Sequence, residues 1–290
     1  MKKVILFILS ILIFAALIPG CNTQNTDSDK LTIISTVFPG YDFARQITGD
    51  KAEVSILLPA GSESHHFEPT PKDIVKIQNC DLFIYTGGEN DAWVEEIISS
   101  LDTAPVTVKM LDVAEMPTDD EHVWTSPLYA GKISQLIKDA LCKIDPENET
   151  FYSENYNTYS AELLKLDESF RDFFETYKPI MVFGDRFPLK HFAEAYDITY
   201  YSAFEGCSAE TEPSAAELAN IIKVVKTQNI DTIFCIEFSN RKVAKSISEA
   251  TGAEIRQFHT CHNVTQEELN NGATYISLME ENLRVLKEVF

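Results

Sequence analysis

The stretch ENETFYSENYNTYSAELLKLDESFRDFFETY, residues 147–177, determines the architecture that we predict for this chain. It contains no Gly and no Pro, and Pro179 follows it. Apolar side chains recur along it every three to four residues, at Leu163, Leu166, Phe170, Phe173 and Phe174. This spacing predicts an amphipathic helix, which would span roughly 45 Å at about 1.5 Å per residue. Two shorter helices with a kink are the alternative, and we favour one long connecting helix.

Strand-like and helix-like patterns alternate on both sides of this segment. The strands predicted before it are 31–37, 52–58 and 81–85, and those predicted after it are 180–183, 199–203, 232–236 and 254–258. Helical patterns begin near residues 41 and 71 and recur at 189–196, 214–227, 240–251 and 275–289. Such alternation is typical of an α/β fold with a mainly parallel sheet. We therefore expect two α/β lobes, 31–146 and 179–290, with mainly parallel sheets joined by one long rigid helix at 147–178.

The N-terminus has the features of an export signal. Two lysines precede an apolar run at 4–18, which is short for a membrane-spanning helix and is followed by Pro19, Gly20 and Cys21. We interpret residues 1–20 as a lipoprotein signal peptide. Residues 18–21, Ile-Pro-Gly-Cys, resemble a bacterial lipobox, which implies that Cys21 is lipidated. Ordinary secretion with a free Cys21 is the alternative. The polar residues 21–30 then form a tether.

Composition narrows the function further. Hydrophobic residues make up 44% of the 290 positions, enough for packed domains and too many for a disordered chain. Lys and Arg number 24 against 45 Asp and Glu, a formal net charge of −21. This charge repels phosphate backbones, so we expect no nucleic-acid partner. The six cysteines include no CxxC pair, which argues against a zinc ribbon or a thioredoxin-like centre.

The histidines are the most informative residues. His191 falls within an amphipathic helical pattern and is predicted to be structural, whereas the other five occupy three loop-like places, at His65 and His66, at His122, and at His259 and His262. Neutral imidazole is a strong ligand for divalent transition metals. Ligands on loops of both lobes would meet at the cleft between the lobes, so we predict a metal site there. Unrelated surface histidines are the alternative.

Two motifs support the metal site. Residues 64–71, Ser-His-His-Phe-Glu-Pro-Thr-Pro, and 120–127, Asp-Glu-His-Val-Trp-Thr-Ser-Pro, resemble motifs of the metal-binding lipoproteins that serve bacterial ABC importers for zinc and manganese. The lipobox, the strand–helix alternation and the long middle helix match this family too, so the resemblance covers nearly the whole chain. It implies that His65 and His122 are metal ligands.

The sequence departs from that family at two places. The family's third ligand, His or Glu, follows the first strand after the long helix, where this chain has Gly184. The substitutes left open are Asp185, Glu205, Glu210 and Glu212. The fourth ligand, usually Asp, falls within 258–263, where His259 or His262 would take its role. A Cys207–Cys261 disulfide would tie the two altered loops together, unless one of these cysteines binds the metal directly.

Ligand type indicates the metal. Three imidazoles suit Zn²⁺ as bound cargo, with Mn²⁺ as second choice because it prefers oxygen ligands. The acidic residues just before His122 either attract cations or form a solvated loop, and we favour the solvated loop. The resemblance implies a monomeric, extracytoplasmic lipoprotein, lipid-anchored to the bacterial cell membrane, that delivers the metal to a membrane ABC permease and is not an enzyme. A secreted zinc hydrolase is the alternative, although the chain has no HExxH and no GxSxG motif.

Overall fold

The computed structural model describes residues 30–62, 67–114, 118, 120–204 and 213–290. Leu31–Phe290 forms one compact unit. The predicted signal peptide at 1–20, the lipidation site Cys21 and all of the tether except Lys30 lie outside the described residues. Within the described ranges, no helix is both long and apolar enough to cross a membrane.

The chain alternates strands and helices in both halves, as the sequence predicts. The strands are β1 (Leu31–Ser35), β2 (Ala52–Ile56), β3 (Leu82–Tyr85), β4 (Val106–Lys109), β5 (Ile180–Phe183), β6 (Thr199–Ser202), β7 (Thr232–Cys235) and β8 (Glu254–Gln257). The α-helices are α2 (Phe38–Thr48), α3 (Pro71–Gln78), α4 (Ala92–Ser100), α5 (Pro127–Ile144), α6 (Glu149–Tyr177), α7 (Lys190–Ala195), α8 (Ala215–Thr227), α9 (Lys242–Thr251), α10 (Gln266–Asn270) and α11 (Tyr275–Val289). Short 3₁₀ turns are η2 (Glu89–Asp91), η3 (Met110–Val113), η4 (Val123–Thr125) and η5 (Pro146–Asn148).

The two halves repeat one topology. The described strands form two four-stranded sheets, ordered β2-β1-β3-β4 and β6-β5-β7-β8. Every paired strand runs parallel to its neighbour, for example Leu31 opposite Ala52 and Ile180 opposite Thr199. In each sheet the second strand along the chain (β2 or β6) forms one edge and pairs with the first strand (β1 or β5). The third and fourth strands lie on the other side of the first strand. The predicted fold class, two α/β lobes with parallel sheets, is confirmed.

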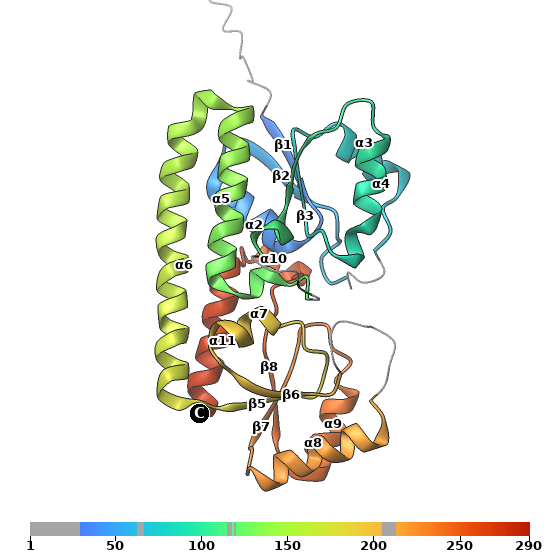
Figure 1. The fold of residues 1–290 in the computed structure, drawn as a ribbon, viewed down its shortest axis with the longest axis vertical. Helices are drawn as coiled ribbons and strands as arrows, with labels where there is room; N and C mark the ends of the chain where they lie inside the picture. The colour runs from blue at the N-terminus through green and yellow to red at the C-terminus, as the bar shows by residue number, and fades with distance from the viewer. Residues whose placement is uncertain (1–29, 63–66, 115–117, 119, 205–212) are drawn as a thin grey trace, which may run out of the picture. The chain divides into compact units, whose positions relative to one another are not determined.

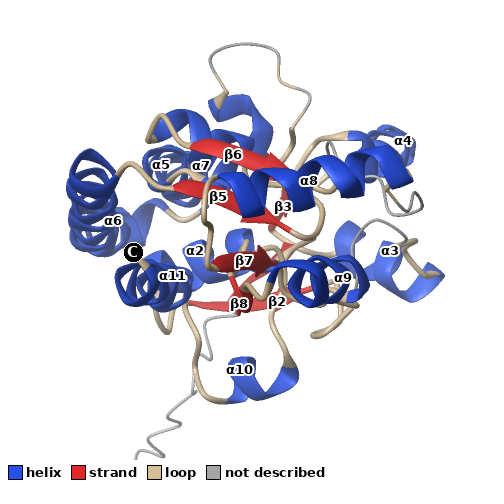
Figure 2. Ribbon diagram, turned by 90° about the horizontal axis from the view of Figure 1, so that it is seen from below, coloured by secondary structure: helices blue, strands red, loops and turns tan. Residues whose placement is uncertain are grey.

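Each sheet is covered on both faces because side chains alternate along buried strands. In β3, Leu82 and Ile84 enter the main hydrophobic core, whereas Phe83 enters a smaller cluster with residues of α3 and α4. In β5, Phe183 enters the main core and Val182 faces the cluster beneath α8 and α9. Figure 2 shows α8 and α9 on the side of the second sheet opposite α11. One main core thus receives side chains from both sheets.

The long helix α6 lies along this main core (Figure 1). It is continuous over 29 residues and contacts α2, α5 and α11. Its buried residues are Tyr152, Tyr159, Leu163, Leu166, Asp167, Phe170, Phe173 and Phe174. It ends at Lys178, whose left-handed backbone (φ 43°) lets its amide bond to the Phe174 carbonyl. The prediction of one long helix is confirmed.

Helix α2 begins earlier than the sequence pattern indicates. We expected the helix to begin near residue 41, but α2 starts at Phe38 and includes Pro39 and Gly40 in its first turn. A proline is tolerated there because the first-turn amides have no partner within the helix. A Cβ atom at Gly40 would lie 2.5 Å from the Ser35 hydroxyl, so glycine lets the helix approach β1 closely.

Candidate metal centre

Two predicted ligands, His122 and His262, lie together in the structure. Their ring centroids are 4.9 Å apart and the rings are nearly perpendicular. His122 is fully buried and His262 is half-buried. Trp124 packs against both rings, with centroids 5.2 Å from His122 and 5.1 Å from His262. The segment before α5 and the segment after β8 therefore bring imidazoles from distant parts of the chain into contact.

Asp120 fixes the orientation of the His122 ring. Its Oδ1 accepts hydrogen bonds from the His122 amide at 3.0 Å and from Nδ1 of the ring at 2.6 Å. A proton on Nδ1 places the lone pair of the neutral imidazole on Nε2. Metal-binding histidines are commonly held by a carboxylate in this way. The contact therefore fixes the ring in an orientation and tautomer that are common among metal-binding histidines.

The expectation of a solvated acidic loop is wrong for Asp120. The residue is only 8% exposed, and its second oxygen accepts a hydrogen bond from the Lys190 amide at 3.0 Å. Burial alone would raise the pKa of the Asp120 carboxyl. The hydrogen bonds and charge of His122, with the Lys190 amide, outweigh burial and lower this pKa to about 2. Asp120 is thus an ionised part of the site, which sequence reasoning missed although the residue stands inside the quoted motif.

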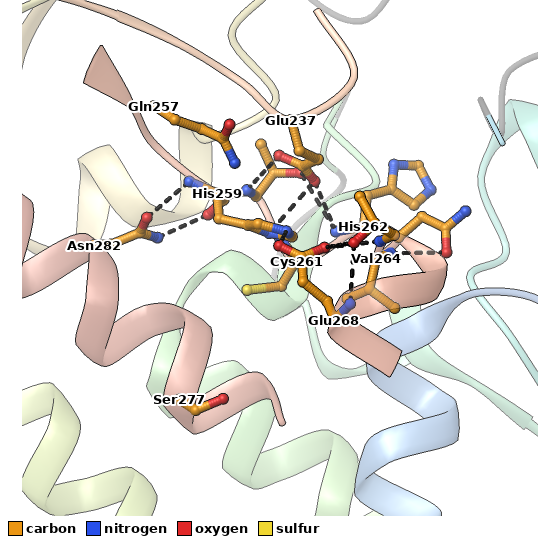
Figure 3. A network of polar contacts seen from close by, with 12 residues as sticks. Glu237, Gln257, His259, Cys261, His262, Val264, Glu268, Ser277 and Asn282 are labelled. Atoms are coloured by element: carbon orange, nitrogen blue, oxygen red, sulfur yellow. Dashed lines mark hydrogen bonds and ion pairs between the residues drawn. The ribbon is translucent and has the colours of Figure 1, made fainter. Parts of the chain in front are cut away.

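The loop after β8 is held by a second buried carboxylate, Glu237, which follows β7 (Figure 3). Its oxygens accept hydrogen bonds from the Thr260 amide at 2.8 Å, from the Thr260 hydroxyl, and from the His262 amide at 3.3 Å. All these donors belong to the 258–264 loop, and none is an imidazole nitrogen. Glu237 therefore holds the backbone that presents His262. No motif in the sequence marks this role.

His259 is oriented differently from His262. Its Nδ1 accepts a hydrogen bond from the Cys261 amide at 2.9 Å, and Asn282 binds its backbone on both sides, at 2.7 Å each. Its Nε2 is buried without a hydrogen-bond partner and lies 3.9 Å from Oε1 of Glu268. In Figure 3 the His259 ring lies inside the polar network, whereas the His262 ring points away from it.

The loop that leads to His65 is tied to the same place. The Asn263 side-chain amide donates to the carbonyls of Pro59 and Ser62, at 2.8 and 2.9 Å, and the Gly61 amide donates to Val264 at 2.8 Å. These bonds fix residues 59–62 beside Asn263, which directly follows His262. His65 and His66 themselves lie outside the described residues.

The two histidine-bearing segments are also bonded directly to each other. The indole Nε1 of Trp124 donates to the Thr260 carbonyl at 3.0 Å. The hydroxyl of Tyr275, at the start of α11, donates to the Trp124 carbonyl at 2.7 Å. Both contacts are buried, so they hold His122 and His262 in a fixed relative position.

The place of the family's third ligand is filled by packing. A Cβ atom at Gly184 would lie 2.6 Å from the Cα of Ala244, so α9 leaves no room for a side chain there. The neighbouring Asp185 is 9% exposed, and its Oδ2 is buried without a hydrogen-bond partner. Burial raises the pKa of the Asp185 carboxyl. The other candidates for this position, Glu205, Glu210 and Glu212, lie outside the described residues.

Among the described residues, no group of three or more His, Cys, Asp or Glu side chains is arranged to hold a metal ion. Cys261 is a free, fully buried thiol in the main core, and its predicted disulfide partner Cys207 lies outside the described residues. Their pairing stays a prediction.

Known proteins resemble the chain over most of its length. The zinc-binding lipoprotein AdcA of Streptococcus pneumoniae strain R6 is 30% identical over 308 residues, with 99% of this chain and 61% of AdcA covered. The chain thus spans about three-fifths of that relative. The high-affinity zinc uptake system protein ZnuA of Bacillus subtilis is 31% identical, with 94% and 93% covered.

Solved structures agree with this relationship. The metal-dependent lipoprotein YcdH of Bacillus subtilis superimposes with a TM-score of 0.80 at 32% identity, covering 90% of this chain and 100% of that structure. The Zn(II)-bound ZnuA-like domain of Streptococcus pneumoniae AdcA gives 0.77 at 31% identity, covering 90% and 98%. The family model for ZnuA, zinc-uptake complex component A, periplasmic, matches residues 33–289. The chain therefore belongs to the ZnuA family.

Proposed function

We propose that this protein captures a divalent transition metal, with zinc as the cargo, through His122, His262 and His65. The observation that carries the proposal is the 4.9 Å separation of the His122 and His262 rings, with Asp120 holding Nδ1 of His122. Two imidazoles bound to one tetrahedral zinc at ~2.1 Å would have centroids roughly 5 Å apart. His65 would complete the set from the loop fixed beside Asn263.

His259 is disfavoured as a ligand because its ring nitrogen Nδ1 is already hydrogen-bonded within the protein. The lone pair on Nδ1 of His259 already accepts the Cys261 amide, and the proton of the neutral ring is then on Nε2. Metal binding by His259 would break this buried hydrogen bond. His262 has its ring against His122, and its own amide is held by Glu237.

Zinc is favoured over manganese by the same residues. Nitrogen donors suit zinc, whereas manganese prefers carboxylate and carbonyl oxygens. The carboxylates nearest the two rings, Asp120 and Glu237, are occupied by hydrogen bonds from the protein itself. Manganese is therefore the second choice.

Uptake is the proposed role of this capture. The relatives are named as a zinc-binding lipoprotein and a zinc uptake system protein, which supports binding over the alternative of a secreted zinc hydrolase. Together with the lipobox-like residues 18–21, these names support a lipid-anchored, extracytoplasmic monomer that delivers zinc to an ABC permease.

Calorimetry on the chain from residue 22, stripped of metal, tests the capture site. We expect one tight zinc site per chain, with manganese binding more weakly. His122→Ala and His262→Ala should each weaken zinc binding at least 100-fold, because each removes one of a few ligand bonds. His259→Ala is the matched control in the same loop and should change zinc affinity far less. Unchanged affinity in His122→Ala, or loss only in His259→Ala, contradicts the assignment.

The anchor is tested separately in cells. Metabolic labelling with a radioactive fatty acid should label the full-length protein and not Cys21→Ala. Equal labelling of both forms would contradict lipidation at Cys21, without bearing on the metal site.

A further inference from the structure

We propose that His191, on α7 beyond β5, is a positioning residue for zinc capture because it fixes the segment that orients His122. This inference rests on the proposed function above. The sequence pattern marks His191 as a structural residue of an amphipathic helix, and it is indeed only 5% exposed. Its polar contacts, however, are directed at the metal centre and not at its own helix.

The imidazole of His191 binds the backbone of the residue that holds His122. Its Nε2 lies 2.8 Å from the Asp120 carbonyl oxygen and 3.3 Å from the Thr118 hydroxyl. A carbonyl can only accept, so Nε2 carries the proton in this contact. The same Thr118 hydroxyl accepts the Asp120 amide at 3.1 Å. His191 and Thr118 therefore restrain the main chain of Asp120 on both sides of its Cα.

The adjacent residue restrains the Asp120 side chain. The Lys190 amide donates to Oδ2 of Asp120 at 3.0 Å, while Oδ1 faces His122. The first two residues of α7 thus hold both the carbonyl and the carboxylate of Asp120. Since Oδ1 sets the ring angle and tautomer of His122, a shift of Asp120 would move the nitrogen that binds zinc.

Helix α7 is itself firmly anchored, which makes it an effective support. Phe192 is 1% exposed, and its ring packs against Phe170 of α6 and Phe258 after β8, with centroids 5.0 and 5.3 Å apart. The His191 ring packs edge-on against Tyr129 of α5, at 5.5 Å. A support packed on these elements can transmit position to Asp120 without taking part in metal binding.

Two substitutions separate the hydrogen bond from the packing. His191→Phe keeps an aromatic ring against Tyr129 and removes the donor to Asp120. His191→Gln supplies an amide donor near the position of Nε2, so it is the conservative rescue. Val225→Ala is the control for general destabilisation, because Val225 is buried in the separate cluster beneath α8 and α9 and has no described contact with α7 or Asp120.

Zinc affinity is measured by competition with a chromophoric chelator, and Co²⁺ absorption reports the coordination geometry. We expect His191→Phe to weaken zinc binding about 10-fold, within the range for partners behind metal ligands, and to alter the Co²⁺ spectrum. His191→Gln should restore most of the zinc affinity and of the Co²⁺ spectrum. Val225→Ala should lower Tm while leaving the affinity and the spectrum unchanged. In the metal-free protein, ¹⁵N NMR should show a shift in the His122 tautomer population in His191→Phe alone.

Other outcomes overturn the inference. If His191→Phe lowers Tm but binds zinc like the wild type, the residue is only structural. If Val225→Ala weakens zinc binding equally, affinity follows global stability and not the position of Asp120. His122→Ala in the same assay separates the two proposals: wild-type affinity in that variant refutes the capture site itself, whereas its loss with unchanged His191→Phe refutes only the positioning role.

Discussion

The segment before α5, residues 120–125, and the segment after β8, residues 258–264, use the same kind of group for different purposes. Each depends on one buried carboxylate, Asp120 in the first and Glu237 in the second. Asp120 accepts hydrogen bonds from an imidazole nitrogen and from the His122 and Lys190 amides. Glu237 accepts them from two amides and a hydroxyl of the loop, and from no imidazole nitrogen. The first carboxylate places the lone pair of a neutral His122 ring on Nε2, and the second holds the loop that carries His262.

This difference predicts that one carboxylate mainly affects metal affinity and the other mainly affects the stability of the fold. Asp120 should affect metal affinity most, because it orients the His122 ring and the backbone around it is also held by Thr118 and His191. Glu237 should affect stability most, because the Thr260 amide and hydroxyl that donate to it are buried, and each donor left unpaired costs free energy. Substitutions at the two positions should therefore give opposite patterns.

The largest effect on stability is expected for Glu237→Leu. It leaves the Thr260 amide, the Thr260 hydroxyl and the His262 amide without their shared acceptor. Because the His262 amide also donates to the Thr260 hydroxyl at 3.3 Å, two buried groups are left unpaired. At ~1–3 kcal/mol for each, we expect a loss of at least about 2 kcal/mol in the free energy of unfolding, measured by urea denaturation. Glu237→Gln keeps one acceptor oxygen and should lose clearly less. Equal losses in both variants would show that the charge, and not the hydrogen bonds, holds the loop.

Asp120→Asn should show the reverse pattern. Asn keeps one oxygen for His122, but its amide group faces the Lys190 amide, a donor that now meets a donor. The neutral side chain also makes the His122 ring less basic. We expect zinc affinity to fall 10- to 100-fold, with a loss of stability of about 1–2 kcal/mol. Calorimetry and urea denaturation on the same sample provide the comparison, and a larger loss of stability than in Glu237→Leu would reverse the assignment of the two roles.

The fold was largely predictable because its signals are local. The absence of Gly and Pro and the three- to four-residue spacing in 147–177 identify α6, and short apolar runs identify every described strand except β4, which was not predicted. Helix α5 was not predicted, although its buried Ile133, Ile137 and Leu141 show helical spacing. The early start of α2 depends on the close approach of Gly40 to β1, which is a tertiary contact that periodicity does not contain.

The candidate site was predictable only where a motif marks it. The Asp-Glu-His-Val-Trp motif locates His122, but the choice between His259 and His262 depends on the backbone. Cys261 has a left-handed φ of 61°, and its amide binds the His259 ring. Glu237 is distant in sequence from the loop that it supports. Such choices follow from the three-dimensional arrangement, and a single sequence does not reveal them.

A third buried carboxylate, Asp91, also accepts hydrogen bonds from main-chain amides. It tests how much the charge of such a carboxylate affects the stability of the fold. Its Oδ2 accepts hydrogen bonds from the amides of Thr86 and Gly87 and from the Thr36 hydroxyl. Burial raises its pKa to about 6; the charge of Glu121 adds to this rise, and the hydrogen bonds oppose it. Since this pKa exceeds the ordinary value of ~3.9, the protonated form stabilises the fold below about pH 4, and this contribution is lost as the pH rises through about 6.

Asp91→Asn should remove that pH dependence while retaining an acceptor oxygen. Relative to the wild type, the variant should gain stability on the order of 2 kcal/mol between about pH 4 and about pH 7.5, measured by urea denaturation. Asp91→Ala is the control, because it lacks the acceptor and should be destabilised at both pH values. A constant difference between Asp91→Asn and the wild type across this range would show that the pKa of Asp91 is not raised.

The smallest expected effect on stability concerns the hydrogen bond from Tyr275 of α11 to Trp124 in the segment 120–125. Tyr275 donates its hydroxyl to the Trp124 carbonyl, whereas the buried hydroxyl of Tyr159 has no hydrogen-bond partner among the described residues. Both rings pack on Phe43. Tyr275→Phe should cost ~1 kcal/mol, while Tyr159→Phe should be neutral or slightly stabilising, because it removes an unsatisfied hydroxyl. Thermal melts of the two variants are directly comparable, because each substitution removes a single hydroxyl group. If the two variants are destabilised alike, the Tyr275 hydroxyl does not support the His122 segment, and the bond from Trp124 to Thr260 is left as the direct link between the two segments.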